Sequence, residues 1–242
     1  HLNDPIETVV PDEKTRTRPI FRGHTLANTH RWVNRYYQCE ADTFPAKTAG
    51  TTVRWLEENS QTGPFFLWVD FFDPHEPWDP PEYLVRRYDP DYTGIPMLHP
   101  NYGPSSAYTP EELHNLWAHY AAESELVDRH IGRVLQKIDD LRLWENTIVV
   151  VMSDHGMSIG EHGRTGKSNI HEQDNRYWPI YPEIGHELFL IAGGDIPRGR
   201  SLDLIAQPMD IVPTLCELAG FTVKPPKPLD GLSFAEPVLN GK

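Results

Sequence analysis

Apolar residues form three runs of strand length along the chain. Residues 65–69 are uninterruptedly apolar between Pro64 and Asp70, which is typical of a central strand covered on both faces. Residues 147–152 are β-branched and apolar, and β-branched residues favour strands. Residues 188–191 repeat this pattern before two glycines. We therefore expect three buried strands.

Helical spacing marks the segments between these runs. Apolar residues recur through 46–59, and Gly63 with Pro64 ends that segment; a helix is also predicted over 210–219, stopped by Gly220. The clearest helix opens at Thr109, where Pro110 occupies the first turn and Glu112 follows the cap by three residues. That pattern is a capping box.

This third helix carries an apolar stripe that predicts packing on a sheet. The stripe comprises Leu113, Leu116, Trp117, Tyr120, Val127, Ile131, Val134, Leu135, Ile138 and Leu141. Charged residues lie on the opposite face, and we expect that face to be solvated because unpaired charges are rarely buried. They are Glu123, Glu125, Asp128, Arg129 and Lys137.

Strands that alternate with helices predict an α/β fold, with a mainly parallel central sheet flanked by helices. The 242 residues are enough for a single domain, 1–242, with one sizeable core. Residues 1–45 and 221–242 are expected to be a mostly irregular lead-in and an irregular tail. Residues 76–108 are rich in proline and lack a period, which predicts a long functional loop.

Charge and composition exclude some classes of function. Thirty-five acidic against 22 basic residues give a net charge of −13, which argues against a nucleic-acid partner. No run approaches the roughly 20 apolar residues of a membrane helix. Two distant cysteines suggest no disulfide framework. The chain begins His1-Leu2-Asn3, so we expect any targeting segment upstream, and the compartment stays open.

Two of the expected strands end in polar residues. Ligands of open α/β sheets gather beyond the carboxyl ends of strands, which draws attention to residues 70–78 and to Asp154 with His155. A carboxylate beside an imidazole suits a divalent ion if Gly156 lets the loop turn both inward. Alternatively, Asp154 caps backbone amides next to a surface histidine.

His75 and Lys167 are the other candidates for chemistry. His75 lies between two prolines, a stiff platform for a donor aimed at an anionic oxygen or a leaving group. Lys167 follows Gly166 in a glycine-rich segment and can point a cation into a cleft. Taken alone, each residue is more often an ordinary surface side chain.

These pieces together resemble the sulfatase family of the alkaline phosphatase superfamily, over most of the chain and in the family's order. The resemblance rests on the strand followed by Asp73-Pro74-His75-Glu76-Pro77, on the helix from Tyr120 to Leu135, on Ser153-Asp154-His155-Gly156, on Gly160-Glu161-His162-Gly163 with Gly166-Lys167, on Asp210-Ile211-Val212-Pro213-Thr214-Leu215 and on Leu229-Asp230-Gly231-Leu232-Ser233.

The resemblance implies an alkaline phosphatase-like fold that is incomplete at its N-terminus, and a role for each matching residue. Asp154 and His155 would complete the coordination of one divalent ion, most often Ca²⁺, with Mg²⁺, Mn²⁺ or Zn²⁺ as alternatives. His75 and Lys167 would bind the sulfate oxygens and assist the leaving oxygen. Glu161 and His162 are weaker candidates, because they could equally order their loop.

The departures from the family pattern matter equally. Family members carry an early Asp-Asp metal pair and a Cys-x-Pro-x-Arg or Ser-x-Pro-x-Arg segment, whose Cys or Ser becomes the formylglycine nucleophile. Neither Cys39 nor Cys216 lies in such a segment, so the nucleophile is expected upstream of this chain. Residues 168–179 look like an insertion, which leaves the roles of Glu172, Glu183 and His186 open.

Three functions remain in competition. The first is a metal-dependent sulfuric ester hydrolase, acting on a small-molecule or saccharide sulfate, for which this chain is the C-terminal half of the catalytic domain and inactive alone. The second is a phosphodiester or phosphonate monoester hydrolase, with His186 as a possible late metal ligand. The third is a sulfatase-like domain that binds without turnover. The oligomeric state stays open.

Overall fold

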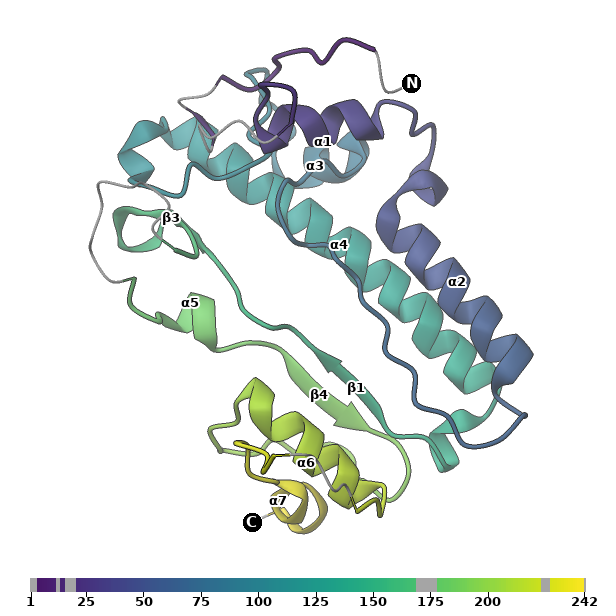
Figure 1. The fold of residues 1–242 in the computed structure, drawn as a ribbon. Coiled ribbons are helices and arrows are strands. Elements are labelled where there is room, and N and C mark those ends of the chain that lie inside the picture. The colour runs from purple at the N-terminus through teal and green to yellow at the C-terminus, as the bar shows by residue number, and fades with distance from the viewer. Residues whose placement is uncertain (1–3, 12–13, 16–20, 169–177, 223–226, 242) are drawn as a thin grey trace. The chain divides into compact units, whose positions relative to one another are not determined.

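The computed structural model describes residues 4–11, 14–15, 21–168, 178–222 and 227–241. The chain divides into two compact units (Figure 1). Unit 1 comprises residues 1–141 and 156–186, and unit 2 comprises residues 142–155 and 187–242. The expectation of a single domain over 1–242 stays a prediction.

A long helix organises unit 1. Helix α4, Pro110–Asp140, has 31 residues and packs against α2, Phe44–Asn59, and α3, Glu82–Tyr88 (Figure 1). The predicted capping box is confirmed: Thr109 Oγ1 accepts from the Glu112 amide at 3.2 Å, and Glu112 Oε2 accepts from the Thr109 amide at 2.8 Å. The cap satisfies amides that the first helical turn leaves free.

Helix α3 lies inside the segment 76–108 that was expected to be a long loop. Seven residues are too few to show a period, so the expectation was wrong at this point. Leu84 and Val85 are buried against α4, where small side chains let the two helices approach closely. The α4 residues in this cluster are Ala118, Ala122 and Leu126. Packing rather than local pattern therefore stabilises α3.

The lead-in 1–45 is also more regular than expected. Helix α1, Leu26–Asn34, and the 3₁₀ turn η2, Glu40–Asp42, lie within it. Asn28 is buried, and its side-chain oxygen accepts from the amides of Val9 and Val10 at 2.8 and 3.0 Å. The side chain of Asn28 thus takes the place of a strand partner for an extended segment, which no hydrophobic period could reveal.

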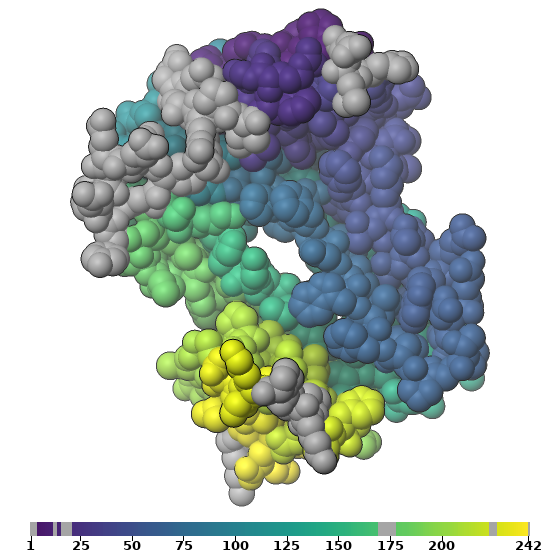
Figure 2. All heavy atoms as spheres, in the orientation of Figure 1, coloured from purple at the N-terminus to yellow at the C-terminus, as the bar shows by residue number. Residues whose placement is uncertain are grey.

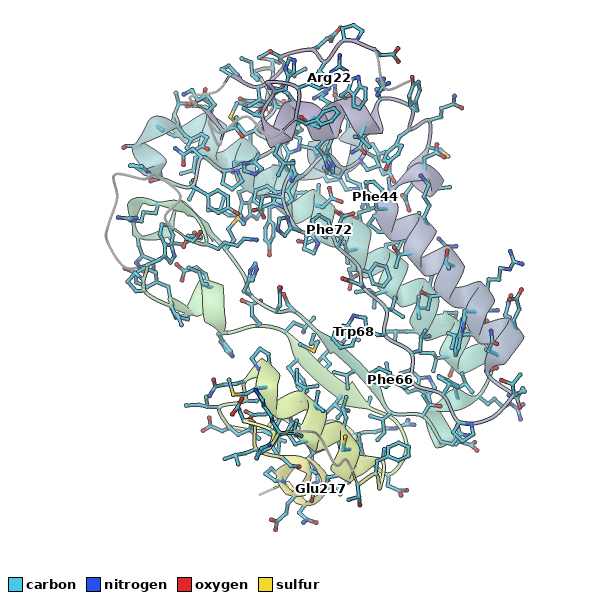
Figure 3. All side chains as sticks on the ribbon, viewed as in Figure 1. Arg22, Phe44, Phe66, Trp68, Phe72 and Glu217 are labelled. Carbon is cyan, nitrogen blue, oxygen red and sulfur yellow. The ribbon has the colours of Figure 1, made fainter. Side chains whose placement is uncertain are left out.

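Residues 65–69 were expected to form a buried central strand, and the structure contradicts this expectation. The segment is extended, but no strand is assigned to it. Its alternate side chains are exposed, Phe66 to 77% and Trp68 to 68%, and Phe72 beyond the segment is exposed to 61% (labelled in Figure 3). The segment lies at the surface, in blue in Figure 2. An apolar run predicts burial only where a neighbouring strand exists to pair with it.

Unit 1 also contains short elements around the candidate residue Lys167. Strands β2, Ser158–Ile159, and β3, Thr165–Gly166, pair antiparallel and flank the 3₁₀ turn η5, Glu161–Gly163. Helix α5 is Pro182–Gly185, and a second 3₁₀ turn, η3, is Ser105–Ala107. Strand β2 is buried and contacts α4.

Unit 2 contains both remaining predicted strands, but neither is buried as expected: the residues of β1 are half-buried, and those of β4 alternate between half-buried and exposed. Strand β1, Val149–Met152, pairs antiparallel with β4, Phe189–Ala192. The 3₁₀ turn η4, Leu143–Glu145, belongs to the same unit. Helix α6, Pro208–Leu218, confirms the predicted late helix. Helix α7, Ala235–Asn240, lies in the tail that was expected to be irregular, and it packs on α6.

The fold is thus α/β, but the described residues contain no mainly parallel sheet. Both described sheets have two strands, and both pairs are antiparallel. Alternation of strands and helices predicted the class correctly, and pairing direction depends on long-range contacts that alternation does not encode. Within the described part of the chain, every helix is too short or too polar to cross a bilayer.

Candidate active site

The loop that carries His75 is held by hydrogen bonds at both ends. The His75 amide donates to the Phe72 carbonyl at 3.1 Å. Trp78 is fully buried, its indole donates to the Pro74 carbonyl at 2.8 Å, and its amide donates to the Leu98 carbonyl at 2.7 Å. The loop is therefore a fixed platform.

The imidazole of His75 is itself oriented by two contacts. It stacks on Phe72 with ring centroids 4.6 Å apart. Its Nδ1 lies 2.7 Å from the Glu76 carbonyl oxygen, which can only accept, so Nδ1 carries the proton. The other nitrogen, Nε2, faces away from this bond, and the side chain is 36% exposed.

Lys167 follows directly on strand β3, whose position is fixed by polar contacts. The Thr165 hydroxyl donates to Asn101 Oδ1 at 2.6 Å, and the Thr165 amide donates to the Gly103 carbonyl at 2.9 Å. Gly166 has φ +100°, and a Cβ there would lie 2.9 Å from the Tyr102 ring. Only glycine permits this conformation and this close approach.

The structure brings His75 and Lys167 together, although 92 residues separate them. Lys167 Nζ lies 3.1 Å from His75 Nε2. Glu76 lies next to Lys167: its side chain is only 4% exposed, and its Oε2 is 3.5 Å from Lys167 Nζ. The Tyr102 hydroxyl donates to Glu76 Oε1. A cation and an imidazole nitrogen thus share one spot: Lys167 can donate to an oxyanion, and His75 can donate as well once Nε2 is protonated.

Asp154 and His155 follow strand β1 in unit 2. The Ser153 amide donates to the Leu188 carbonyl at 3.1 Å, which extends the β1–β4 pairing to the residue before them. Asp154 Oδ1 accepts from the His155 amide at 2.9 Å, and the carboxylate and imidazole lie 3.5 Å apart. Their side chains are 81% and 40% exposed. The joining of this pair with His75 and Lys167 in one site stays a prediction.

The donor chemistry of Asp154 and His155 is that of a partial metal-ligand set. One carboxylate and one imidazole on adjacent residues can both ligate a divalent ion. Calcium takes six to eight oxygen ligands, and the described residues contain no group of three or more His, Cys, Asp and Glu able to hold a metal ion. Asp154 and His155 therefore fit a metal only with further ligands beside them.

The weaker candidates make local contacts that order their own loop. The Ile159 amide donates to Glu161 Oε2 at 2.5 Å. His162 stacks on Tyr181 and lies 3.0 Å from Glu183. Glu183 also accepts from the Ser158 hydroxyl at 3.1 Å.

His186 follows helix α5, and its amide donates to the Pro182 carbonyl at 2.8 Å. His186 is exposed. Glu172 lies outside the described residues, as do residues 169–177 of the expected insertion.

Sequence reasoning missed a buried acidic cluster beside the platform, formed by Asp73 and Glu123. Glu123 of α4 was expected on a solvated face but is 4% exposed. Burial raises the pKa of Asp73 to about 6, and burial, then the charges of Asp73 and Asp79, raise that of Glu123. Burial also lowers the pKa of His119 to about 4. Burial therefore makes the charged forms of these carboxyl groups costly for stability.

Solved structures define the fold class. The phosphonate monoester hydrolase of Agrobacterium radiobacter superposes with a TM-score of 0.69 at 25% identity, over 86% of this chain and 44% of that one. The fold is therefore the α/β fold of the alkaline phosphatase-like hydrolases.

The family model described as Sulfatase matches residues 6–221. The chain belongs to the sulfatase family.

Individual sulfatases show the same relationship. Iduronate 2-sulfatase of Mus musculus is 30% identical over an alignment of 219 positions, which covers 73% of this chain and 40% of the mouse protein. An arylsulfatase of Clostridium perfringens is 26% identical over an alignment of 219 positions, which covers 85% of this chain and 44% of that protein. The chain thus spans less than half the length of these relatives.

Proposed function

We propose that this chain supplies the anion-binding residues and two metal ligands of a metal-dependent sulfuric ester hydrolase. One observation supports the proposal above the others. Lys167 Nζ and His75 Nε2 come within 3.1 Å of each other from segments 92 residues apart, on a framework of buried side chains. Such preorganised donors stabilise charge that grows in a transition state.

The two residues divide the work by their chemistry. Lys167 offers a fixed positive charge and three donors to the sulfate oxygens. His75 offers Nε2 to the oxygen of the leaving group, which needs a proton when the ester bond breaks. Because Nδ1 already donates to the Glu76 carbonyl, Nε2 can deliver a proton only when both ring nitrogens are protonated.

Asp154 and His155 would hold the divalent ion, for which the family resemblance implies Ca²⁺. Because His155 offers a nitrogen where Ca²⁺ prefers oxygen, Mn²⁺ and Zn²⁺ are the alternatives that suit this pair. A bound cation would neutralise sulfate charge and polarise the ester. The formylglycine nucleophile would come from residues outside this chain, because neither cysteine of the chain lies in the required segment. The 242-residue chain alone is then inactive.

Sulfated saccharides or small molecules are the proposed substrates. The names of the relatives, iduronate 2-sulfatase and arylsulfatase, support a sulfate ester. Exposed aromatic side chains, which stack on sugar faces, support the saccharide.

Sulfate binding by the 242-residue chain tests the central pair directly. Addition of sodium sulfate should shift the ring signals of His75 in NMR spectra saturably. Lys167→Ala should abolish the saturable shift, whereas the matched variant Lys47→Ala, at an exposed lysine, should retain it. The proposal would be contradicted if sulfate shifted the His75 ring signals of Lys167→Ala saturably and to the same extent as in the wild type.

A second candidate reaction is hydrolysis of phosphonate monoesters. The superposition on a phosphonate monoester hydrolase favours it as a member of the same superfamily. Paired aryl sulfate and aryl phosphonate assays of the whole protein separate the two reactions. A faster kcat/KM for the phosphonate would replace the first proposal with the second, and absence of both activities in a sulfate-binding protein would favour a binding domain without turnover.

A further inference from the structure

Glu76 is a buried carboxylate that the proposed reaction does not use. Its side chain is 4% exposed, and its Oε2 is fully buried without a hydrogen-bond partner. A buried charge is strongly unfavourable unless an opposite charge compensates it. The nearest groups that can do so are Lys167 Nζ at 3.5 Å and His75 Nδ1 at 3.6 Å.

The contacts of Glu76 reach both anion-binding residues through different atoms. Its carbonyl oxygen holds His75 Nδ1 at 2.7 Å, which fixes the ring tautomer. Its carboxylate faces Lys167, which in turn lies 3.1 Å from His75 Nε2. One residue therefore sets the orientation of the imidazole and the resting position of the cation.

Tyr102 completes this arrangement from the other side. It is 3% exposed and donates its hydroxyl to Glu76 Oε1. Its ring packs against Gly166, the residue before Lys167. Gly166 has φ +100°, and a Cβ on it would lie 2.9 Å from the Tyr102 ring, so there is no room for a side chain. Tyr102 thus contacts both the carboxylate and the strand that carries the lysine.

We propose that Glu76 and Tyr102 are positioning residues that hold Lys167 and His75 in register for an oxyanion. The proposal rests on the proposed function for the identity of the reaction. When an anionic group arrives, Lys167 exchanges the His75 nitrogen for an anion oxygen while Glu76 Oε2 keeps its Nζ nearby. His75 Nε2 is then free to face the leaving oxygen.

Kinetics of the whole protein with an aryl sulfate test this coupling. Glu76→Gln keeps the shape and an acceptor for Tyr102 but removes the charge, and it should lower kcat by about 10–100-fold, as loss of an outer-shell partner commonly does. KM should change less than about threefold, because orientation matters most in the transition state.

A double-variant cycle separates positioning from general stability. If Glu76 acts through Lys167, Glu76→Gln should lower kcat less than about twofold in a Lys167→Met background. An equal loss in both backgrounds would overturn the proposal. Tyr102→Phe, which removes the hydroxyl that donates to Glu76, should also lower kcat. The matched control Tyr88→Phe, which removes a tyrosine–carboxylate bond to Glu125, should leave it unchanged.

A measurement on the substrate-free 242-residue chain distinguishes failure of this proposal from failure of the proposed function. Ring ¹⁵N shifts should show the Nδ1–H form of His75 in both the wild type and Glu76→Gln, because the backbone carbonyl that holds Nδ1 is unchanged. The Nε2 signal should differ between the two proteins, because Lys167, 3.1 Å from Nε2, loses the carboxylate that faces it. An unchanged Nε2 signal in the variant would overturn the positioning role even if the protein hydrolyses sulfate. A wild type that hydrolyses neither ester would instead overturn the function and leave the Nε2 result decisive for Glu76.

Discussion

Replacement of Asp73 by asparagine should make the protein more stable at neutral pH. The side chain of Asp73 is 6% exposed, and burial raises its pKa from 3.8 to about 6. Burial penalises the charged form because the interior replaces water poorly as a solvent for ions. The carboxylate is therefore unfavourable in the folded state at pH 7.

The sign and size follow from the two pKa values. The folded state binds the proton more tightly than the unfolded state, so the stabilisation from protonated Asp73 is complete below pH 3.8 and is lost as the pH rises through 6. The rise from 3.8 to about 6 corresponds to about 3 kcal/mol. Most of this change falls between pH 4 and pH 7.

His119 opposes this trend in the wild type. Its pKa is lowered to about 4 by burial, so its contribution to stability is complete above pH 6.5 and is lost as the pH falls through 4. The two windows overlap, and the wild-type curve alone cannot separate them. The difference between Asp73→Asn and the wild type isolates Asp73.

Urea denaturation at both pH values measures the effect. Asp73→Asn should raise the free energy of unfolding, relative to the wild type, by about 2–3 kcal/mol more at pH 7 than at pH 4. The matched variant Asp91→Asn removes an exposed carboxylate and should change stability by less than about 0.5 kcal/mol at either pH. An equal difference at pH 4 and pH 7 for Asp73→Asn would refute the reasoning.

Three further variants test the framework of unit 1 by thermal or urea denaturation. Thr109→Ala removes the acceptor for the Glu112 amide and should destabilise by about 1 kcal/mol, whereas no change would show that α4 does not need its cap. Gly166→Ala forces a Cβ onto Tyr102 at φ +100° and should cost about 1–3 kcal/mol, and wild-type stability would show that the backbone relaxes freely. Leu116→Ala empties a fully buried position and should cost about 2–5 kcal/mol; a loss below about 1 kcal/mol would contradict the core packing.

The three longest described helices, α2, α4 and α6, and the unit 2 strands could be predicted from the sequence because their signals are local. The capping box at Thr109, the helix over 46–59 and the apolar run at 147–152 each depend on neighbours within a few residues. Hydrophobic period and capping act over that same range. His75 and Lys167 could be proposed as a pair from the family resemblance, and the structure brings them into contact.

The predictions that proved wrong concern segments whose burial or pairing depends on residues far away in the sequence. The run 65–69 has the composition of a central strand, but the described structure gives it no pairing partner. The sequence predicts Glu123 on the solvated face of α4, yet Glu123 is 4% exposed and close enough to Asp73 for the two charges to interact. Helix α3 exists because Leu84 and Val85 find a surface on α4.

The sequence by itself thus determined the family, the class of fold and the residue types of the candidate site. Only the tertiary structure decided that the carboxylate of Glu76 faces Lys167 and accepts a hydrogen bond from Tyr102. The physical reason is range: backbone hydrogen bonds and side-chain periods are read over one or two turns, whereas the field at a site is made by charges that the fold brings together from distant parts of the chain.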